Sequence, residues 1–216
     1  MDKKVVNILG YKPKVSKIRR ESMINFGNCS LFPNQYFSLV NILENYEKVP
    51  QDLISLSKEE KISRIESKGG LLSKLDLSGI KIQVRGRAFE IPGNLIGLEH
   101  IDLFSNNLVY FGIPSTLKNL RYLSCSMNNL GFLEIPDTLS NLSFFNCSDN
   151  YLTRLEIPQT FHSLIELYTK NNSLKLLEIS NNILASIEVF SYSKDFLSND
   201  KIKLFKRFGF YPELSK

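Results

Sequence analysis

Apolar residues recur through the middle of the chain in the pattern L-x-x-L-x-L-x-x-N-x-L, mostly with Leu, Ile, Phe or Cys at the L positions. Copies begin at Leu98, Leu120, Leu142, Leu164 and Ile187, so successive copies lie 22, 22, 22 and 23 residues apart. A degenerate copy begins 26 residues before the first of these, and its extra residues are expected to bulge in QVRGRAFE. A fixed period of this length predicts a solenoid, because one unit cannot bury its apolar face alone.

The second half of each unit also repeats, as FEIPGNLIGL, FGIPSTLKNL, LEIPDTLSNL and LEIPQTFHSL. The first half predicts one short strand per unit, and stacked strands would form a parallel sheet on the concave side. The prolines predict an extended return segment on the convex side, since their φ angle is fixed. A buried asparagine amide where the chain leaves each strand can satisfy backbone groups of two turns. This column contains Asn106, Asn128, Asn150 and Asn172.

These units resemble leucine-rich repeats. The L-x-C-S-x-N-x-L core followed by IP is most similar to bacterial leucine-rich repeats, including those of secreted effector proteins, and the IP-x-x-L half is shared with FNIP-type repeats. The resemblance covers residues 71–198, about six repeats. It implies an α/β solenoid with a concave parallel sheet. It also implies a non-enzymatic protein-interaction module that binds a host target or another bacterial protein.

The flanks break the repeat, and they are expected to cap the open ends of the solenoid. Residues 1–70 predict a helical N-terminal cap. One helix is expected in PNQYFSLVNILENYEKVP, with Phe37, Val40, Ile42 and Leu43 on its apolar side, and others in SKEEKISRIESKGG and KPKVSKIRRESMINFG. Residues 199–216 predict a short amphipathic capping helix, and a membrane-surface helix is the alternative.

Charge is distributed unevenly along the 216 residues. Residues 1–70 carry 12 Lys/Arg and 8 Asp/Glu (+4), residues 71–198 carry 10 and 12 (−2), and residues 199–216 carry 5 and 2 (+3). The mildly acidic middle argues against a phosphate-binding surface there, so no nucleic acid is expected. No apolar run is long enough to span a membrane, and no signal peptide is recognised. We therefore expect a cytosolic protein, or one that bacteria secrete into a host cytosol, and a monomer before partner binding.

Three cysteines provide no paired framework, which favours a reducing compartment. Cys125 and Cys147 occupy inward positions of the repeat, where free cysteine serves as a small apolar residue. The alternative is the C-x-D motif, Cys147 and Asp149, of effector ubiquitin ligases with leucine-rich repeats. That motif lies in a helical catalytic domain after the repeats, and only 18 residues follow the repeats here. The third cysteine, Cys29, falls in the N-terminal flank and is expected to be packed there.

Residues that alternate with the inward positions should face outward from the concave sheet. Aromatic residues recur among them on neighbouring strands, and exposed aromatic groups are typical of protein interfaces. Small serines between them are expected to leave the sheet open to a partner. The predicted contacts are His100, Asp102, Phe104, Tyr122, Ser124, Phe144, Asn146, Glu166, Tyr168 and Lys170.

His100 and Asp102 lie two residues apart on one strand face, so an enzyme with an unrecognised site there is the main alternative function. An open sheet excludes water poorly, however, and this disfavours catalysis. No H-x-x-H or C-x-x-C spacing occurs, so we expect neither a metal site nor a cofactor. Lipid or nucleic-acid binding through the basic flanks is the third hypothesis. The leading prediction is an effector-like adaptor or inhibitor that occludes its partner with the concave face.

Overall fold

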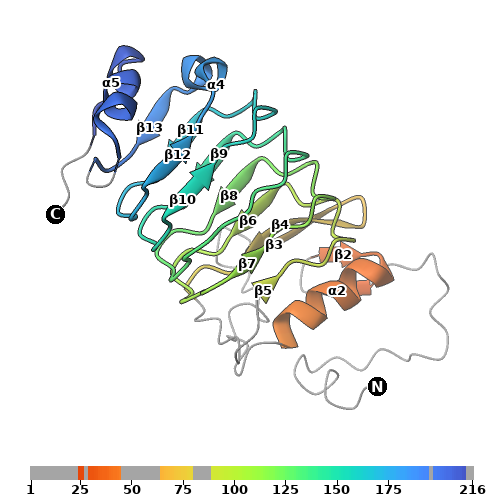
Figure 1. The fold of residues 1–216 in the computed structure, drawn as a ribbon. Coiled ribbons are helices and arrows are strands. Elements are labelled where there is room, and N and C mark those ends of the chain that lie inside the picture. The colour runs from red at the N-terminus through yellow and green to blue at the C-terminus, as the bar shows by residue number, and fades with distance from the viewer. Residues whose placement is uncertain (1–23, 27–28, 45–63, 80–88, 195–196, 213–216) are drawn as a thin grey trace.

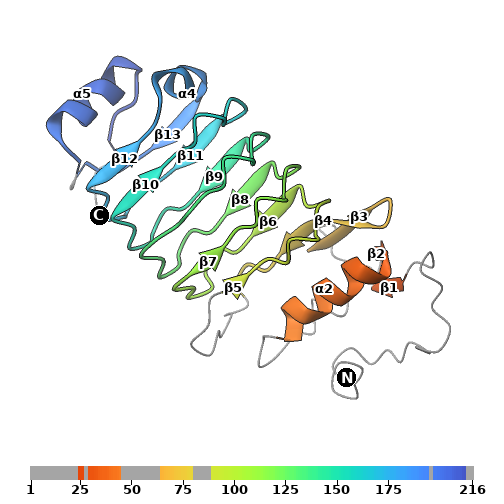
Figure 2. The ribbon, with the colours of Figure 1, turned by 45° about the vertical axis from the view of Figure 1, so that its right-hand side comes forward.

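The computed structural model describes residues 24–26, 29–44, 64–79, 89–194 and 197–212. Within them the chain winds through successive turns, and the turns stack side by side (Figure 1). The helix α2 (Pro33–Glu44) lies at one end of the stack, and α4 (Asn181–Ser186) and α5 (Asn199–Arg207) lie at the other, as both views show (Figure 2). The predicted parallel-sheet solenoid is confirmed.

One strand from each turn enters a seven-stranded sheet, the main sheet, in the order β13-β11-β9-β8-β6-β4-β3. Six strands run parallel, and only β3 is antiparallel to its neighbour β4. Because six parallel strands enclose five intervals, the predicted six repeats correspond to about five full turns. The strands are β3 (Ile65–Lys68), β4 (Leu71–Asp76), β6 (His100–Asp102), β8 (Tyr122–Ser124), β9 (Phe144–Asn146), β11 (Glu166–Tyr168) and β13 (Val189–Ser191).

The opposite wall of the solenoid forms two separate strand pairs. There β5 (Phe89–Glu90) pairs with β7 (Phe111–Gly112), and β10 (Arg154–Glu156) pairs with β12 (Leu176–Glu178), both in parallel. Residues 132–135 occupy the turn between β7 and β10 and belong to no strand. This wall is where the sequence predicts the convex return segments. The expected bulge in QVRGRAFE lies outside the described residues except for its last two, which form β5.

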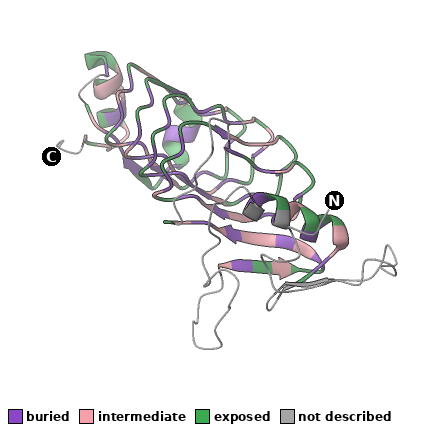
Figure 3. Ribbon diagram, turned by 90° about the horizontal axis from the view of Figure 1, so that it is seen from below, coloured by how far each residue is buried: buried purple, intermediate pink, exposed green. Residues whose placement is uncertain are grey.

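The space between the two walls is filled by the leucine positions of the repeat. Leu98, Ile101, Leu123, Phe145 and Leu167 are all fully buried. Buried residues alternate with half-buried residues along β6, β9 and β11, and Figure 3 colours these two classes purple and pink. This alternation follows from the two-residue period of a strand, and it confirms the inward register predicted from the sequence.

Buried asparagine side chains join each turn to the preceding one. The Asn128 Nδ2 group donates to the carbonyl of Leu103 in the preceding turn (2.9 Å) and to those of Cys125 (2.9 Å) and Ser126 (3.1 Å) in its own turn. Its Oδ1 accepts from the backbone N–H groups of Asn106 (3.1 Å) and Leu108 (2.9 Å). We call this column the asparagine ladder: Asn106, Asn128, Asn150 and Asn172.

Threonine hydroxyls add a second set of links at the tight corner after each IP sequence. The Oγ1 atoms of Thr116, Thr138 and Thr160 donate to backbone carbonyls 23 residues earlier, at 2.6, 2.7 and 2.5 Å. The side chains of Asn119 and Asn141 form similar bonds at 3.0 and 2.8 Å. The T-x-x-N spacing of the return segment therefore has a structural role, because its side chains link successive turns.

The helical caps predicted at the two ends are not confirmed as such. α2 lies within one predicted helix, but it buries Tyr36, Leu39 and Ile42, while Phe37 is exposed. The side chains of Val40 and Leu43 lie outside the described residues. Most residues of the other two predicted helices also lie outside the described residues. The described end of one forms the strand β3. The described end of the other forms β1 (Ile24–Phe26), which pairs antiparallel with β2 (Cys29–Leu31).

The glycine pair Gly69–Gly70 explains why β3 is a strand. The sequence predicts a helix C-terminus there, but Lys68 pairs directly with Leu71, so the two glycines form a two-residue hairpin loop. Both have positive φ angles, 58° and 82°, as the favoured tight hairpin turn requires. The resulting strand adds to β4 and occupies the edge of the main sheet.

At the C-terminal end, α5 begins after the N-cap Ser198, whose side chain accepts from the Lys201 N–H. Phe205 is fully buried and packs edge-on against Phe190 and Tyr192, with ring centroids 5.0 Å apart in both pairs. The apolar side of the predicted amphipathic segment therefore contacts the last turn of the solenoid.

Replacing Asn128 with Ala should destabilise the protein more than most surface changes. The substitution leaves two backbone N–H groups without their acceptor, while the three carbonyls that accept from Asn128 each keep a second donor. Each unsatisfied buried N–H group costs about 1–3 kcal/mol, so we expect a loss of at least about 2 kcal/mol in denaturant unfolding. Asn129→Ala removes an exposed amide in the next position and should change stability by less than about 0.5 kcal/mol. Equal effects of the two substitutions would contradict a structural role for the ladder.

Candidate functional site

The outer face of the main sheet presents two columns of side chains in register. The strand pairing aligns Lys74, His100, Tyr122, Phe144, Glu166 and Val189 in the first column. It aligns Asp76, Asp102, Ser124, Asn146, Tyr168 and Ser191 in the second. Both columns agree with the alignment predicted from the repeat. Residues 22 positions apart in the sequence therefore become direct neighbours across the sheet.

Four rings on this face form a continuous stack. His100 and Tyr122 are parallel with centroids 4.0 Å apart, and Tyr122 and Phe144 are parallel at 4.3 Å. Phe144 and Tyr168 are tilted by 40° at 5.5 Å, because Tyr168 belongs to the second column. The Tyr168 hydroxyl donates to Glu166 Oε2 (2.8 Å), which fixes the last ring. We call His100, Tyr122, Phe144 and Tyr168 the ring ladder.

The other predicted contact residues occupy different environments. Phe104 is 40% exposed and lies outside the ring ladder. Ser124 is only 3% exposed, so its hydroxyl is not accessible in this structure, and Ser126 and Ser148 are buried too. The serines that the sequence predicts to leave the sheet open are therefore not accessible to a partner in this structure. Asn146 is half-buried and its Oδ1 accepts from the Ser148 N–H (3.0 Å), while Glu166 and Lys170 are half-buried at the same end of the face.

Partial burial shifts the titration of three groups in this face. Burial lowers the pKa of His100, and the nearby Lys74 ammonium lowers it further. Burial raises the pKa of Asp102, although the hydrogen bonds from the Phe104 N–H (2.8 Å) and Ser124 oppose the shift. Burial also raises the pKa of Tyr122, and the neighbouring Asp102 adds to it. The lowered pKa of His100 and the raised pKa of Tyr122 both favour the neutral form of these two rings, and Asp76 and Asp102 lie along one side of them.

The geometry does not join His100 and Asp102 into a catalytic pair. Among the described residues, the Asp102 carboxylate is bonded to the Phe104 N–H and Ser124, while the His100 ring stacks on Tyr122. The other histidine, His162, is exposed in a return segment. A nucleophile–base–acid arrangement requires hydrogen bonds between its members, and none connects these side chains here. In the described part of this face, His100 and Asp102 therefore lack the geometry of a catalytic pair.

Cys125 and Cys147 are fully buried inside the solenoid, as the repeat predicts. Burial raises the pKa of Cys125 to about 12 and raises that of Cys147 well above its ordinary value. The Cys147 thiol donates to the Tyr168 carbonyl at 3.6 Å. Asp149 lies in the following turn with φ 55° and accepts from Asn171 Nδ2 (2.7 Å). The described structure therefore supports packing for Cys147 and a turn role for Asp149.

Two grooves of the described structure lie on the opposite wall, where no site is predicted from the sequence. They flank residues 132–136, where the wall is not paired. One signal was present in the sequence, because the recurring E-I-P places Glu90, Glu134 and Glu156 in one column. Among the residues that the structure describes, no cluster of His, Cys, Asp and Glu could hold a metal ion. In the same part of the chain, no helix has the length and apolarity to cross a membrane.

Comparisons with known proteins provide a likeness in shape only. No family model matches the chain, and no curated protein matches it. Among solved structures, a chain of the crystal structure of PEPR1–AtPEP1 is similar, with 25% identity and a TM-score of 0.49. The match covers 76% of this chain and 25% of that chain, so this chain spans about a quarter of its neighbour. The fold assignment therefore rests on the strand register and the asparagine ladder.

The buried thiols should not react in the folded protein. In a Cys29→Ser background, Cys125 and Cys147 should show no reaction with a thiol reagent such as DTNB at pH 8, because the thiolate is the nucleophile and burial suppresses it. Both should react after unfolding in guanidinium chloride. Cys147→Ala should lower stability by about 1 kcal/mol or more through the lost packing and leave binding unchanged. Rapid labelling of the native protein would contradict the packing role.

His100 should titrate below 6.5, the ordinary value, in an NMR titration of its imidazole. His162→Gln assigns the signal, since the chain has two histidines. Lys74→Met should raise the His100 pKa by removing the second cause of the shift. The unfolded chain binds the proton more readily than the native state, so the His100 contribution to stability should fall as pH decreases from about 6.5 towards the native pKa. A native pKa at or above 6.5 would rule out a desolvated imidazole.

Proposed function

We propose that this chain is a binding module for another protein and that it contacts its partner through the ring ladder on the outer face of the main sheet, the concave face of the repeat. The observation that carries the proposal is the stack of His100, Tyr122, Phe144 and Tyr168. Stacked rings present a broad apolar strip, and aromatic anchors supply much of the binding energy in protein interfaces.

The ring ladder is organised before a partner arrives. Each ring is held by its strand and by at least one neighbouring ring, and Tyr168 is also held by Glu166. Binding therefore immobilises few additional rotamers, a cost of about 0.5–1.5 kcal/mol for each flexible side chain in other interfaces. The solenoid supports the strip from below, because Leu123 and Phe145 on the same strands are fully buried.

The face is also large enough for a specific interface. Strands of a sheet lie about 4.8 Å apart, so the five intervals between parallel strands span about 24 Å. A standard interface buries about 800 Å² on each partner, which a patch of this width can supply. Charged groups border the strip, with Asp76 and Asp102 near one end and Lys170 near the other. Such groups can fix the orientation of a partner and exclude others.

We further propose that the protein acts in a cytosol as an adaptor or an inhibitor of the bacterial effector type, blocking a partner enzyme or linking two proteins. The support for this is the resemblance of the L-x-C-S-x-N-x-L core and the presence of unpaired, buried thiols suited to a reducing compartment. An enzyme centred on His100 and Asp102 is less well supported, because the carboxylate is already bonded to Phe104 and Ser124.

Truncation of the central rings should weaken partner binding at least tenfold. Once the partner is identified by affinity capture, calorimetry on Tyr122→Ala and Phe144→Ala should show this loss, since a buried aromatic anchor is worth about 2 kcal/mol or more. Each ring stacks on two neighbours, so the variants should also lose about 1–3 kcal/mol of stability and remain folded.

Two control variants separate binding from folding. Tyr151→Ala removes a 63% exposed ring away from the main sheet and should leave the affinity unchanged. Leu123→Ala, on the same strand as Tyr122 but fully buried, should destabilise the fold by about 2–5 kcal/mol. If both ring variants bind the partner as tightly as the natural sequence, the ring ladder is not the interface.

A further inference from the structure

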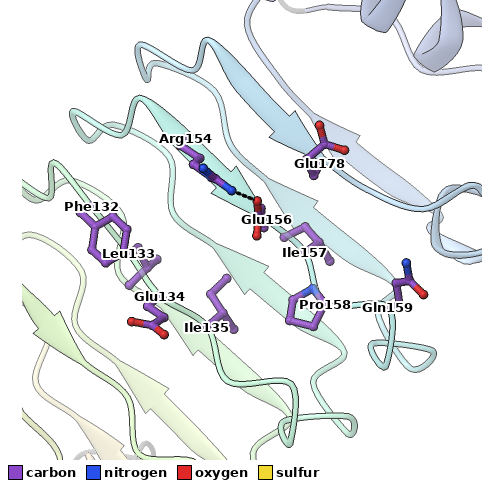
Figure 4. Close-up of a pocket in the computed structure, with 10 residues that line it drawn as sticks. All are labelled: Phe132, Leu133, Glu134, Ile135, Arg154, Glu156, Ile157, Pro158, Gln159 and Glu178. Carbon is purple, nitrogen blue, oxygen red and sulfur yellow. Dashed lines mark hydrogen bonds and ion pairs between the residues drawn. The ribbon is translucent and has the colours of Figure 1, made fainter.

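A groove of about 630 Å³ runs along β10 on the wall opposite the ring ladder. Figure 4 shows residues 132–135 on one side and Arg154 and Glu156 of β10 on the other. Its volume falls within the range of about 300–1,000 Å³ that is typical of ligand pockets. We call it the β10 groove. Its lining residues are Phe132, Leu133, Glu134, Ile135, Arg154, Glu156, Ile157, Pro158, Gln159 and Glu178.

The groove exists because one edge of β10 has no partner strand. The Thr153 carbonyl and the Ile157 N–H bond towards β12, so the intervening Leu155 does as well. Backbone groups of successive residues in a parallel strand point to opposite sides, and those of Arg154 and Glu156 therefore face the groove. Within the described residues, no backbone hydrogen bond joins them to residues 132–135. Such an open edge is a template for strand addition.

Side chains give the groove a defined chemical character. Leu133, Ile135 and Ile157 are at most 9% exposed and form an apolar floor. Glu134, Glu156 and Glu178 lie in one column above it, and the lining residues include a single cation, Arg154, which pairs with Glu156. Glu178 pairs with Lys201 of α5 at 3.5 Å. Glu134 is exposed and forms no ion pair with any described residue, so the groove carries excess negative charge.

We propose that the β10 groove binds an extended segment of a partner protein by strand addition, with a lysine or arginine of that segment between Glu134 and Glu156. A strand added to β10 places every second side chain outward, beside the glutamate column, and the alternate side chains inward on the floor. The segment is therefore basic at one outward position and small and apolar at its inward positions. Its backbone bonds to Arg154 and Glu156, and its cation balances the carboxylate of Glu134.

This surface is separate from the ring ladder, since the two lie on opposite walls of the solenoid. The two surfaces can therefore be occupied at the same time, as an adaptor would require. Failure at the groove would leave the proposed concave-face interface intact, and Tyr122→Ala should not affect binding at the groove.

The probe is a fluorescein-labelled peptide, TVTVKVTV, titrated against the full chain in low salt by fluorescence anisotropy. We expect saturable binding, and we expect the peptide with Glu in place of Lys to bind at least about fivefold more weakly. A peptide with Pro in place of the Val that precedes Lys should also lose binding, because proline donates no backbone hydrogen bond. NMR-detected hydrogen exchange should show new protection at the Arg154 and Glu156 amides and none at the β8 amides.

Charge reversal of the protein completes the test. Glu134→Lys should weaken binding of the Lys peptide at least about fivefold. Glu188→Lys reverses an exposed charge outside the groove and should not change this affinity. The proposal is overturned by equal binding to both variants, by no binding at millimolar peptide, or by protection away from β10. Concentration-dependent dimerisation that Glu134→Lys abolishes would assign the groove to a second copy of this chain and also overturn it.

Discussion

The structure depends on the buried amide at the end of each strand. An α-helix bonds its own backbone, but a solenoid turn leaves backbone groups at its corners that water cannot reach. Asn128 satisfies five of them, three carbonyls and two N–H groups, and these belong to two successive turns. Because the Nδ2 and Oδ1 atoms reach back to fixed positions, the amide sets how far each turn is displaced from the last. The place of a residue in the repeat therefore determines where it lies in the solenoid.

This regular displacement of successive turns brings together the rings of the ring ladder, which are distant in the sequence. His100, Tyr122 and Phe144 are each 22 residues apart, and the strand register makes them neighbours with rings 4.0 and 4.3 Å apart. This separation is slightly less than the strand spacing of about 4.8 Å, so parallel rings on adjacent strands meet at contact distance. Glu166 follows in the same column and cannot stack, so the ladder continues diagonally to Tyr168.

The sequence alone predicts the environment of a residue wherever the repeat determines that environment. The inward leucines, both buried cysteines, the asparagine column and the two outward columns all follow from its period. The sequence alone does not predict the local structure where the same residues are compatible with two structures. Gly69–Gly70 suits a helix end or a hairpin equally, and only pairing of β3 with β4 decides between them. Phe37 likewise has helical spacing, yet the packing of α2 leaves it exposed and buries Tyr36 instead.

The two walls of the solenoid also differ although every turn contributes to both. The main sheet is paired without interruption through seven strands, which holds its turns at the spacing of a β-ladder. Among the described residues, the opposite wall contains the pairs β5–β7 and β10–β12, and residues 132–135 between them belong to no strand. A stack that is shorter on one side must bend towards it, and a bent stack cannot pair fully on its longer side. The same pairing that brings the rings together on one face therefore opens the backbone of β10 on the other.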